Sequence, residues 1–450
     1  MRRIALIISM LVCGLALSAQ VALTDNTHEV MDIIPEANTG LNHIFVVYDV
    51  AGVSMTYTAQ TENPVNWLEY GELGGGYAEP VEGVIAEGLV TTLPQVKSNR
   101  GYIIEEGTTR TYVWVTDYAS YRLSLNGLQV DNDGDCATAT LHVDGAGDDI
   151  VYYSITGVRR VLSRELKLTC NNLEWNDSTW MEIDAVEVET GFKPTIVVPA
   201  PLCNTVFTLT GDRFLEFWGE GLRRESNYYQ TAAVDARAVA IQEERNNDNE
   251  TGKTEGTLGG SAPAKIHFEA FCTDAVVHYE WQMAYDPNFE DIQLRLNQTA
   301  TDQEFNEAGT FYWRFIGSNS DGSCEAFSDV FTVDIGDSEL RCPNVFTPGT
   351  SEGVNDVWKV SYRSIIDFHC WIFNRWGQQV CEFTDPSQGW DGTYRGKLVG
   401  PGVYYYVIRA RGSDGRTHNT SGDINIIRYK NRGESGGGAI VPDDPDEPVE

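Results

Sequence analysis

One short stretch of the sequence has the spacing of a catalytic nucleophile. Residues 349–353 read GTSEG and match the pattern G-x-S-x-G around Ser351. In α/β-hydrolases this pattern forms a sharp turn between a strand and a helix, which exposes the serine hydroxyl. Here Pro348 precedes the stretch and VNDVWKV follows it, so the sequence predicts a loop that enters a strand. We therefore expect no catalysis at Ser351, and the chain is predicted not to be an enzyme.

A second stretch concentrates carboxylates, whose oxygens are the ligands that Ca²⁺ prefers. DNDGDC at 131–136 carries Asp131, Asp133 and Asp135. The glycine is misplaced for an EF-hand loop, and His142 stands where the bidentate Glu should be. The sequence therefore favours an acidic hairpin turn, with a calcium site at these three aspartates as the alternative. No other cofactor is expected.

The histidines and tryptophans give no clear site. The seven histidines show neither an HExxH pattern nor a second histidine close by, which argues against a metal centre. Trp175, Trp180 and Trp218 could stack on sugar rings if they face solvent. Core packing is the favoured interpretation, because aromatic side chains supply much of the buried area of small sandwiches.

The cysteines indicate disulfides more than metal ligands. Eight remain once Cys13 near the N-terminus is set aside, and an even number in an exported chain is typical of disulfide bonding. Neither a CxxC pattern nor a Cys/His cluster at zinc spacing occurs. The residues considered for disulfides are Cys136, Cys170, Cys272, Cys324, Cys370 and Cys381.

Two of these pairings follow from the expected elements. Trp281 lies between Cys272 and Cys324, so a bridge between them would pin a sandwich around a buried tryptophan. A hairpin centred on the turn at 375–376 sets Cys370 opposite Cys381, within disulfide reach. Two buried thiols would fit the same hairpin geometry.

The N-terminus predicts export. Arg2 and Arg3 precede an apolar stretch and a small-residue site, which together form a signal peptide cut after Ala19. The net charge of −34, from 66 acidic and 32 basic residues, argues against a nucleic-acid or anionic-membrane partner. No later apolar run approaches the roughly 18 to 20 residues of a transmembrane helix.

Short runs rich in β-branched and aromatic residues, separated by Gly, Asp, Asn and Pro, predict an all-β chain of tandem Ig/PKD-like antiparallel β-sandwiches. The Ala-rich segment 228–247 fits either helix or strand, and we favour strand; the polar segment 246–264 reads as a linker. The predicted domains are a signal peptide at 1–19, sandwiches at 20–116 and 117–194, a β-rich module with linker at 195–260, a further sandwich at 261–336, a C-terminal sandwich at 337–430 and a disordered acidic tail at 431–450.

The C-terminal sandwich carries the strongest pattern. Four stretches follow in order: CPNVFTPGTSEGVNDVWKV, IIDFHCWIFNRWGQQV, GWDGTYRGKLVGPGVYYYVI and GDINIIR. Asp414-Gly415 is a strong hairpin turn, and centring a hairpin on it sets Val403 opposite Ile426 and Tyr405 opposite Ile424.

These stretches resemble the gliding motility-associated C-terminal domain, the type B sorting domain that type IX secretion systems read. The segment YEWQ…AGTFYWR within 261–336 resembles PKD and fibronectin-like sandwiches. The chain departs from the sorting family by GTSEG where NGDG is usual and by the residues after Arg428. The positions that match the sorting motifs are Asn344, Phe346, Pro348, Asn355, Asp356, Phe373, Asn374, Arg375, Trp376, Gly377, Trp390, Asp391, Gly392, Gly402, Tyr404 and Tyr405.

The resemblance implies export across the outer membrane, with the type IX machinery as partner, and retention at the cell surface, often by attachment to polysaccharide. It implies nothing about chemistry. We expect a noncatalytic surface protein with an adhesive or structural role toward a polysaccharide or protein ligand. The alternatives are a component of the secretion pathway that signals to an envelope sensor kinase and, less favoured, a hydrolase with unrecognised motifs.

Overall fold

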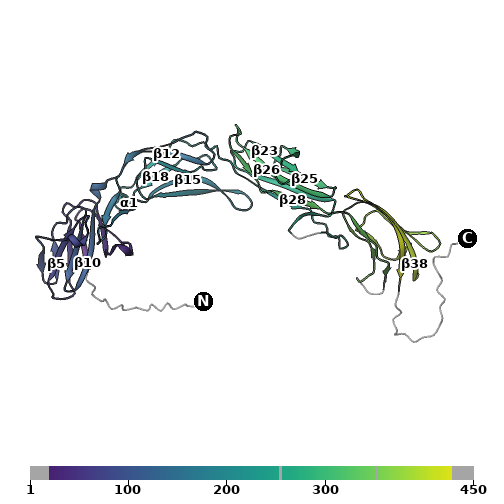
Figure 1. Cartoon of the computed structure of the whole chain (residues 1–450), viewed down its shortest axis with the longest axis horizontal. Helices are drawn as coiled ribbons and strands as arrows, with labels where there is room; N and C mark the ends of the chain where they lie inside the picture. The colour runs from purple at the N-terminus through teal and green to yellow at the C-terminus, as the bar shows by residue number, and fades with distance from the viewer. Residues whose placement is uncertain (1–19, 253–255, 350–352, 428–450) are drawn as a thin grey trace, which may run out of the picture. The chain divides into compact units, whose positions relative to one another are not determined.

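The computed structural model describes residues 20–252, 256–349 and 353–427. The predicted signal peptide, Ser351 and the predicted tail at 431–450 lie outside these residues. The described chain is all-β, as the sequence predicts, and strands fill it in Figure 1 from β5 (Val65–Tyr70) to β38 (Gly402–Gly412). It divides into two compact units, Met1–Asn176 with Met181–Thr231 and Asp177–Trp180 with Ala232–Glu450.

The first unit begins with a two-sheet sandwich, which we call the first sandwich. Alternating apolar residues such as Val47, Tyr57 and Trp67 meet between its sheets in one core. Its sheets have the orders β1 (Gln20–Thr24), β4 (Ser54–Thr58), β8 (Val90–Leu93), β7 (Ile85–Glu87) and β2 (Met31–Ile33), β3 (His43–Val47), β10 (Thr109–Asp117), β9 (Arg100–Glu106), β5, β6 (Glu79–Pro80).

The second sandwich occupies residues 123–231 and differs from the boundaries expected from the sequence. β17 pairs with β12 and β18 pairs with β15, so strands from both sides of residue 194 share one core. A boundary at 194 would divide that core. The elements are β11 (Ser124–Val130), β12 (Thr138–Ala146), β13 (Ile150–Tyr153), β14 (Arg159–Leu162), β15 (Leu166–Trp175), β16 (Trp180–Glu189), β17 (Thr195–Pro199), β18 (Thr208–Gly211), α1 (Arg213–Phe217) and β19 (Leu222–Glu225).

A buried polar network joins the two sandwiches of the first unit. Arg164 and Asp212 form an ion pair with side chains 1% and 0% exposed. Tyr118, in the short helix η3 (Tyr118–Tyr121) that follows β10, donates its hydroxyl to Asp212 Oδ2 at 3.0 Å. Asp212 also caps α1, because its Oδ1 accepts the Leu215 amide at 2.9 Å. One carboxylate thus joins the end of the first sandwich to two elements of the second.

The second unit opens with the third sandwich. Its core stacks Phe268 on Trp313 with ring centroids 4.7 Å apart, and Trp281 is buried beside them as the sequence predicts. The segment 236–242 is a strand, as favoured above, and pairs with β22. The strands are β20 (Ala236–Gln242), β21 (Leu258–Gly260), β22 (Ala264–Cys272), β23 (His278–Ala284), β24 (Ile292–Leu296), β25 (Ala300–Phe305), β26 (Gly309–Ser318), β27 (Glu325–Phe327) and β28 (Phe331–Ile335).

The remaining strands form the C-terminal module, residues 337–427. Its main sheet has the order β30-β39-β38-β33-β34 and covers a core rich in aromatic residues. The strands are β29 (Glu339–Arg341), β30 (Val345–Phe346), β31 (Trp358–Lys359), β32 (Ser361–Arg363), β33 (Ile365–Phe373), β34 (Gln379–Phe383), β35 (Gly389–Trp390), β36 (Thr393–Tyr394), β37 (Lys397–Leu398), β38 and β39 (Thr417–Ile426).

The predicted register of the β38–β39 hairpin is wrong by one residue. Tyr404 pairs with Ile424, and Gly402 pairs with Ile426. The Gly412 amide donates to the Arg416 carbonyl at 2.8 Å, so the loop has three residues centred on Asp414 and not two. Because a one-residue shift exchanges the faces of a strand, Tyr404 is buried and Tyr405 is 47% exposed.

The predicted cysteine pairings also need correction. Cys370 lies opposite Phe383 because a register shift follows Ile372, and the thiols of Cys370 and Cys381 are free. Cys136 and Cys324 are each disulfide-bonded, whereas the thiols of Cys170 and Cys272 are free, so the predicted pairing of Cys272 with Cys324 does not form.

Candidate functional site

Residues of the sorting motifs that lie far apart in sequence meet in one aromatic core of the C-terminal module. The ring centroids of Phe346 and Trp390 are 5.5 Å apart, and those of Trp390 and Tyr404 are 5.1 Å apart. Trp390 is 1% exposed and donates its Nε1 to the Thr393 carbonyl at 2.9 Å. Residues separated by up to 58 positions in sequence, from 346 to 404, therefore stabilise each other.

Close packing explains the glycine and proline of these motifs. A Cβ at Gly392 would lie 2.8 Å from Pro348 Cγ and 3.3 Å from Phe346, and its φ of +75° also favours glycine. Asp391 accepts the Thr393 amide at 2.9 Å and so holds the same turn. Pro348, Asp391 and Gly392 therefore serve the packing and the turn geometry of the module.

The opening motif organises a loop through one carboxylate. Asp356 accepts the Gly349 amide at 3.1 Å and the Gly353 amide at 2.7 Å, and the Thr347 amide donates to the Asn355 carbonyl at 2.8 Å. Asn355 has a φ of +55°, which asparagine tolerates better than most residues. Ser351 lies outside the described residues, so the loop is described only at its two ends.

The motif NRWG forms the turn between β33 and β34, and its members divide between interior and surface. Asn374 is buried, and its Oδ1 accepts the amides of Trp376 at 3.1 Å and Gln378 at 3.0 Å. Gly377 has a φ of +80°. Phe373 is half-buried, whereas Arg375 and Trp376 are exposed, with the guanidinium carbon 4.1 Å from the indole centroid. Gly402 begins β38 with a φ of +154° and lies at the surface.

The linker predicted at 246–264 packs against the C-terminal module. Asn249 Nδ2 donates to the carbonyls of Val360 and Pro386, both at 2.8 Å, and the Tyr362 amide donates to the Asn249 carbonyl at 3.1 Å. The Ser364 amide donates to Ser261 Oγ at 2.8 Å. We call these contacts the clamp. They hold the module to the third sandwich through the part of the linker that the structure describes.

Two of the three aspartates considered for calcium, Asp131 and Asp135, make hydrogen bonds to nearby residues of the chain. Asp135 Oδ1 accepts the amides of Ala137 at 2.7 Å and Thr138 at 3.1 Å, while Asp131 pairs with His142 at 3.0 Å. The hydrogen bonds from the amides of Ala137 and Thr138 lower the pKa of the Asp135 carboxyl. Across residues 20–252, 256–349 and 353–427, no three His, Cys, Asp or Glu side chains are placed to hold a metal ion.

The free thiols are poor nucleophiles because they are buried, as Cys370 is, or half-buried, as Cys170 and Cys272 are. Burial, with a contribution from Cys203, raises the pKa of Cys170 to about 11, and burial raises the pKa of Cys272 to about 11. The pKa of Cys370 is raised still further, again by burial. Since the thiolate is the reactive form, these cysteines remain protonated and unreactive near neutral pH.

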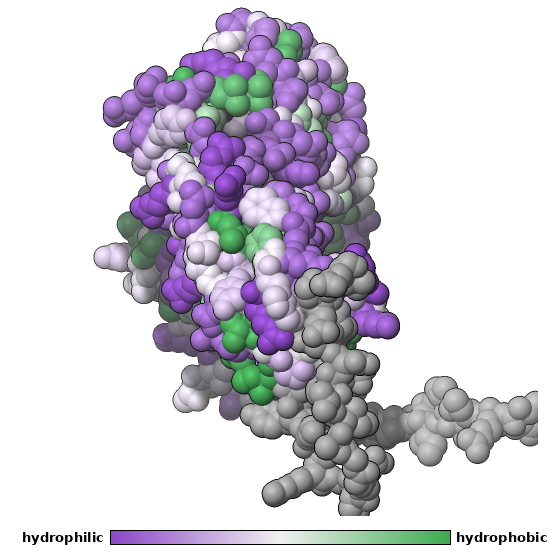
Figure 2. Space-filling view, turned by 90° about the vertical axis from the view of Figure 1, so that its right-hand side faces the viewer, coloured by the Kyte–Doolittle hydropathy of each residue, from purple (hydrophilic) through white to green (hydrophobic). Residues whose placement is uncertain are grey.

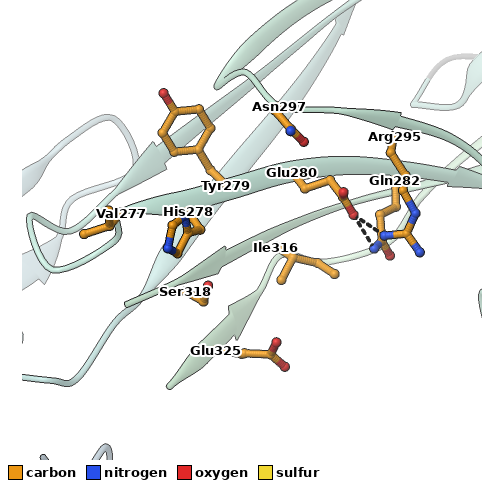
Figure 3. Close-up of a pocket in the computed structure, with 10 residues that line it drawn as sticks. All are labelled: Val277, His278, Tyr279, Glu280, Gln282, Arg295, Asn297, Ile316, Ser318 and Glu325. Atoms are coloured by element: carbon orange, nitrogen blue, oxygen red, sulfur yellow. Dashed lines mark hydrogen bonds and ion pairs between the residues drawn. The ribbon is translucent and has the colours of Figure 1, made fainter. Parts of the chain in front are cut away.

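The third sandwich has a groove of about 480 Å³ on the outer face of its larger sheet. In Figure 3, Glu280 and Gln282 of β23 lie beside Arg295 of β24. Gln282 Nε2 donates to Glu280 Oε1 at 2.6 Å, and Arg295 pairs with the same oxygen. The other lining residues are Val277, His278, Tyr279, Asn297, Ile316, Ser318 and Glu325.

One lining residue of the groove, Gln282, is hydrogen-bonded to an arginine that stacks on two aromatic rings. Arg314 Nε donates to Gln282 Oε1 at 2.9 Å, and the guanidinium carbon lies 4.1 Å from the centroid of Phe289 and 5.2 Å from that of Phe327. Sequence reasoning missed this site, because it has no motif. The alternation of polar residues at 278, 280 and 282 was the available signal, since alternate residues of a strand share one face.

Two features bear on how the chain meets its surroundings. No helix in the described part of the chain is long and apolar enough to cross a membrane. The face shown in Figure 2 is mostly hydrophilic, and its apolar residues form small separate patches.

Trp218, which the sequence suggested as a platform for sugar stacking, is half-buried and donates its Nε1 to the Glu29 carbonyl at 2.8 Å.

Comparisons with solved structures return multi-domain β proteins. The tetra-tandem repeat in the extending region of a large adhesion protein is 10% identical, covers 92% of this chain and 100% of that chain, and has a TM-score of 0.22. The FN1–FN3 domains of chicken CNTN1 are 12% identical, cover 67% of this chain and 98% of that chain, and have a TM-score of 0.23. No curated protein matches the sequence.

Two family models match parts of the chain. Residues 129–226 match the model described as fibronectin type III domain, which falls on the second sandwich and not on 261–336, where the sequence suggested one. The PKD assignment of 261–336 stays a prediction. Residues 340–426 match the model described as CHU_C Type IX secretion signal domain. The predicted sorting module is thereby confirmed, and its presence indicates export to the cell surface or the extracellular space.

Proposed function

We propose that the chain is exported across the outer membrane by a type IX secretion system and acts at the cell surface as a noncatalytic adhesive or structural protein. The match of residues 340–426 to the secretion signal model carries the proposal. The aromatic core that joins Phe346, Trp390 and Tyr404 supports it, because it accounts for motifs far apart in sequence as one folded signal.

Removal of residues 340–450 tests the export step. We expect the truncated chain to stay in the periplasm, protected from protease added outside the cell, while the full chain is digested. The surface variant Glu225→Ala of the full chain should fractionate like the wild type, since Glu225 lies in the second sandwich and is exposed. A truncated chain that reaches the surface would show that the module is not the export signal.

The adhesive role is supported by the groove over β23. Its carboxylates, amides and guanidinium provide both donors and acceptors, and Ile316 adds an apolar lining side chain. A pocket of this volume with a few converging polar groups is suited to a small ligand or one unit of a polymer. Because hydroxyl groups both donate and accept hydrogen bonds, a polysaccharide segment is the ligand that this mixed set fits best.

Binding of the purified chain to a glycan array and to surface polysaccharide from the producing cell tests this role. Arg295→Ala removes a charged donor from the groove and should weaken binding about tenfold, the effect of losing one charged hydrogen bond. Gln293→Ala, on the same strand but outside the groove, should leave binding unchanged. Equal binding by both variants would exclude the groove as the ligand site.

The signalling alternative separates from this proposal in a deletion strain. Loss of a surface adhesin leaves the export of other proteins with this signal intact, whereas loss of a pathway regulator lowers it. We expect their export to be unchanged.

A further inference from the structure

Two arginine–aromatic pairs lie on neighbouring loops of the C-terminal module. Arg375 and Trp376 occupy the turn after β33, and Trp376 is 44% exposed. Tyr394 and Arg395 occupy the β36–β37 hairpin, with the guanidinium carbon 5.2 Å from the ring centroid. We call these four residues the tip.

A hydrogen bond connects the two loops of the tip. Gln378 Nε2 donates to the Tyr394 hydroxyl at 2.9 Å. The backbone of the first loop is fixed separately, because Asn374 accepts the amides of Trp376 and Gln378. The two pairs therefore lie close together on ordered loops, so little conformational entropy is lost when a partner binds them.

The backbone of the first turn is set by residues other than Arg375 and Trp376. Asn374 accepts the Gly377 amide through its carbonyl, and Gly377 has a φ of +80°, so these two residues define the path of the turn. In the second turn Arg395 has a φ of +52° and Gly396 a φ of +79°, the geometry of a type I′ turn. Asparagine is the favoured residue at that first position, so arginine is there against local preference. Residues that oppose local preference are expected at functional sites.

The composition and charge of the tip identify its partner's chemistry. Trp, Tyr and Arg are the residue types that dominate binding energy at protein interfaces. Residues 340–426 carry nine Lys and Arg against eight Asp and Glu, whereas the whole chain has a net charge of −34. A basic, aromatic end on an acidic protein fits a surface that presents carboxylates, which guanidinium groups bind in bidentate geometry.

We propose that Arg375, Trp376, Tyr394 and Arg395 form the surface by which the export machinery recognises the module, through a carboxylate-bearing protein face. This inference rests on the proposed type IX export and names the recognition surface. The buried motif residues then maintain the fold, and the exposed pair of the NRWG motif makes the contact.

Export of full-length variants tests the tip, measured as the ratio of surface-exposed to periplasmic chain. The double variant Arg375→Ala/Trp376→Ala should lower the ratio about tenfold or more, the effect of removing hot-spot residues. Arg395→Asn is the sharper test, because it improves the turn while it removes the charge. It should keep or raise the unfolding temperature and still lower export. Val407→Ala, which alters an exposed apolar side chain on β38 of the same module outside the sorting-motif positions, is the matched control and should export normally.

The outcomes are distinguishable. Reduced export by the tip variants, with the unfolding temperature kept and the control normal, supports the proposal. Normal export of the folded tip variants overturns it, while failure of the 340–450 deletion to block export would instead overturn the proposed function. Variants that reach the surface but are released into the medium also overturn it, because the tip would then serve attachment to polysaccharide and not recognition for export.

Discussion

Replacing Asp212 by alanine is expected to destabilise the first unit by about 3 to 5 kcal/mol, the cost of leaving one partner of a buried ion pair without the other. Arg164 would stay buried with its charge uncompensated, the Tyr118 hydroxyl would lose its acceptor, and α1 would lose its cap. In a unit of this size such a loss lowers the unfolding temperature by about 6 to 20 °C.

Calorimetry of the mature chain measures the effect, and its second unit serves as an internal reference. Because the chain has several domains, we expect more than one transition, and only that of the first unit should move. The control is Arg223→Ala, which breaks an exposed pair with Glu225 and should cost less than about 1 kcal/mol. A similarly small shift for Asp212→Ala would mean that the network does not hold the two sandwiches.

The second large effect is expected at Trp390. Its removal by substitution with alanine leaves a cavity between Phe346 and Tyr404 and should cost about 3 to 5 kcal/mol. The transition of the second unit should fall in temperature, limited proteolysis should begin within residues 340–426, and export should fail because the signal is no longer folded.

Trp376→Ala is the natural counterpart, because it removes the same side chain from the surface of the same module. We expect it to change stability by less than about 0.5 kcal/mol, as is usual for surface positions. A loss of stability at Trp376 comparable to that at Trp390 would contradict the division between buried and exposed motif residues described here.

The features that were predictable from sequence depend on local patterns. Short β-branched and aromatic runs indicate strands wherever they occur, and four motifs in fixed order identify the C-terminal module. The predicted strand registers fail where a single additional residue shifts the pairing of two strands. A third loop residue beside Asp414 moves the register of β38, and an irregularity after Ile372 separates Cys370 from Cys381.

The candidate sites were harder to predict for a related reason. The groove over β23 is formed by residues from four strands, and their proximity follows from sheet order, which the sequence does not state. The boundary at 194 failed likewise, because β17 and β18 pair with strands that precede it. The tip was visible only in part: NRWG marks Arg375 and Trp376, but the bond from Gln378 to Tyr394 comes from tertiary structure.

The clamp has a practical consequence for moving this signal to another cargo. A transplant cut at residue 340 would leave behind Asn249 and Ser261, and the backbone around Tyr362 and Ser364 would lose its partners. Unpaired backbone groups at such a cut are costly when they are not solvated. The portable unit is therefore the third sandwich together with the module, residues 232–427, and a new passenger belongs in front of it.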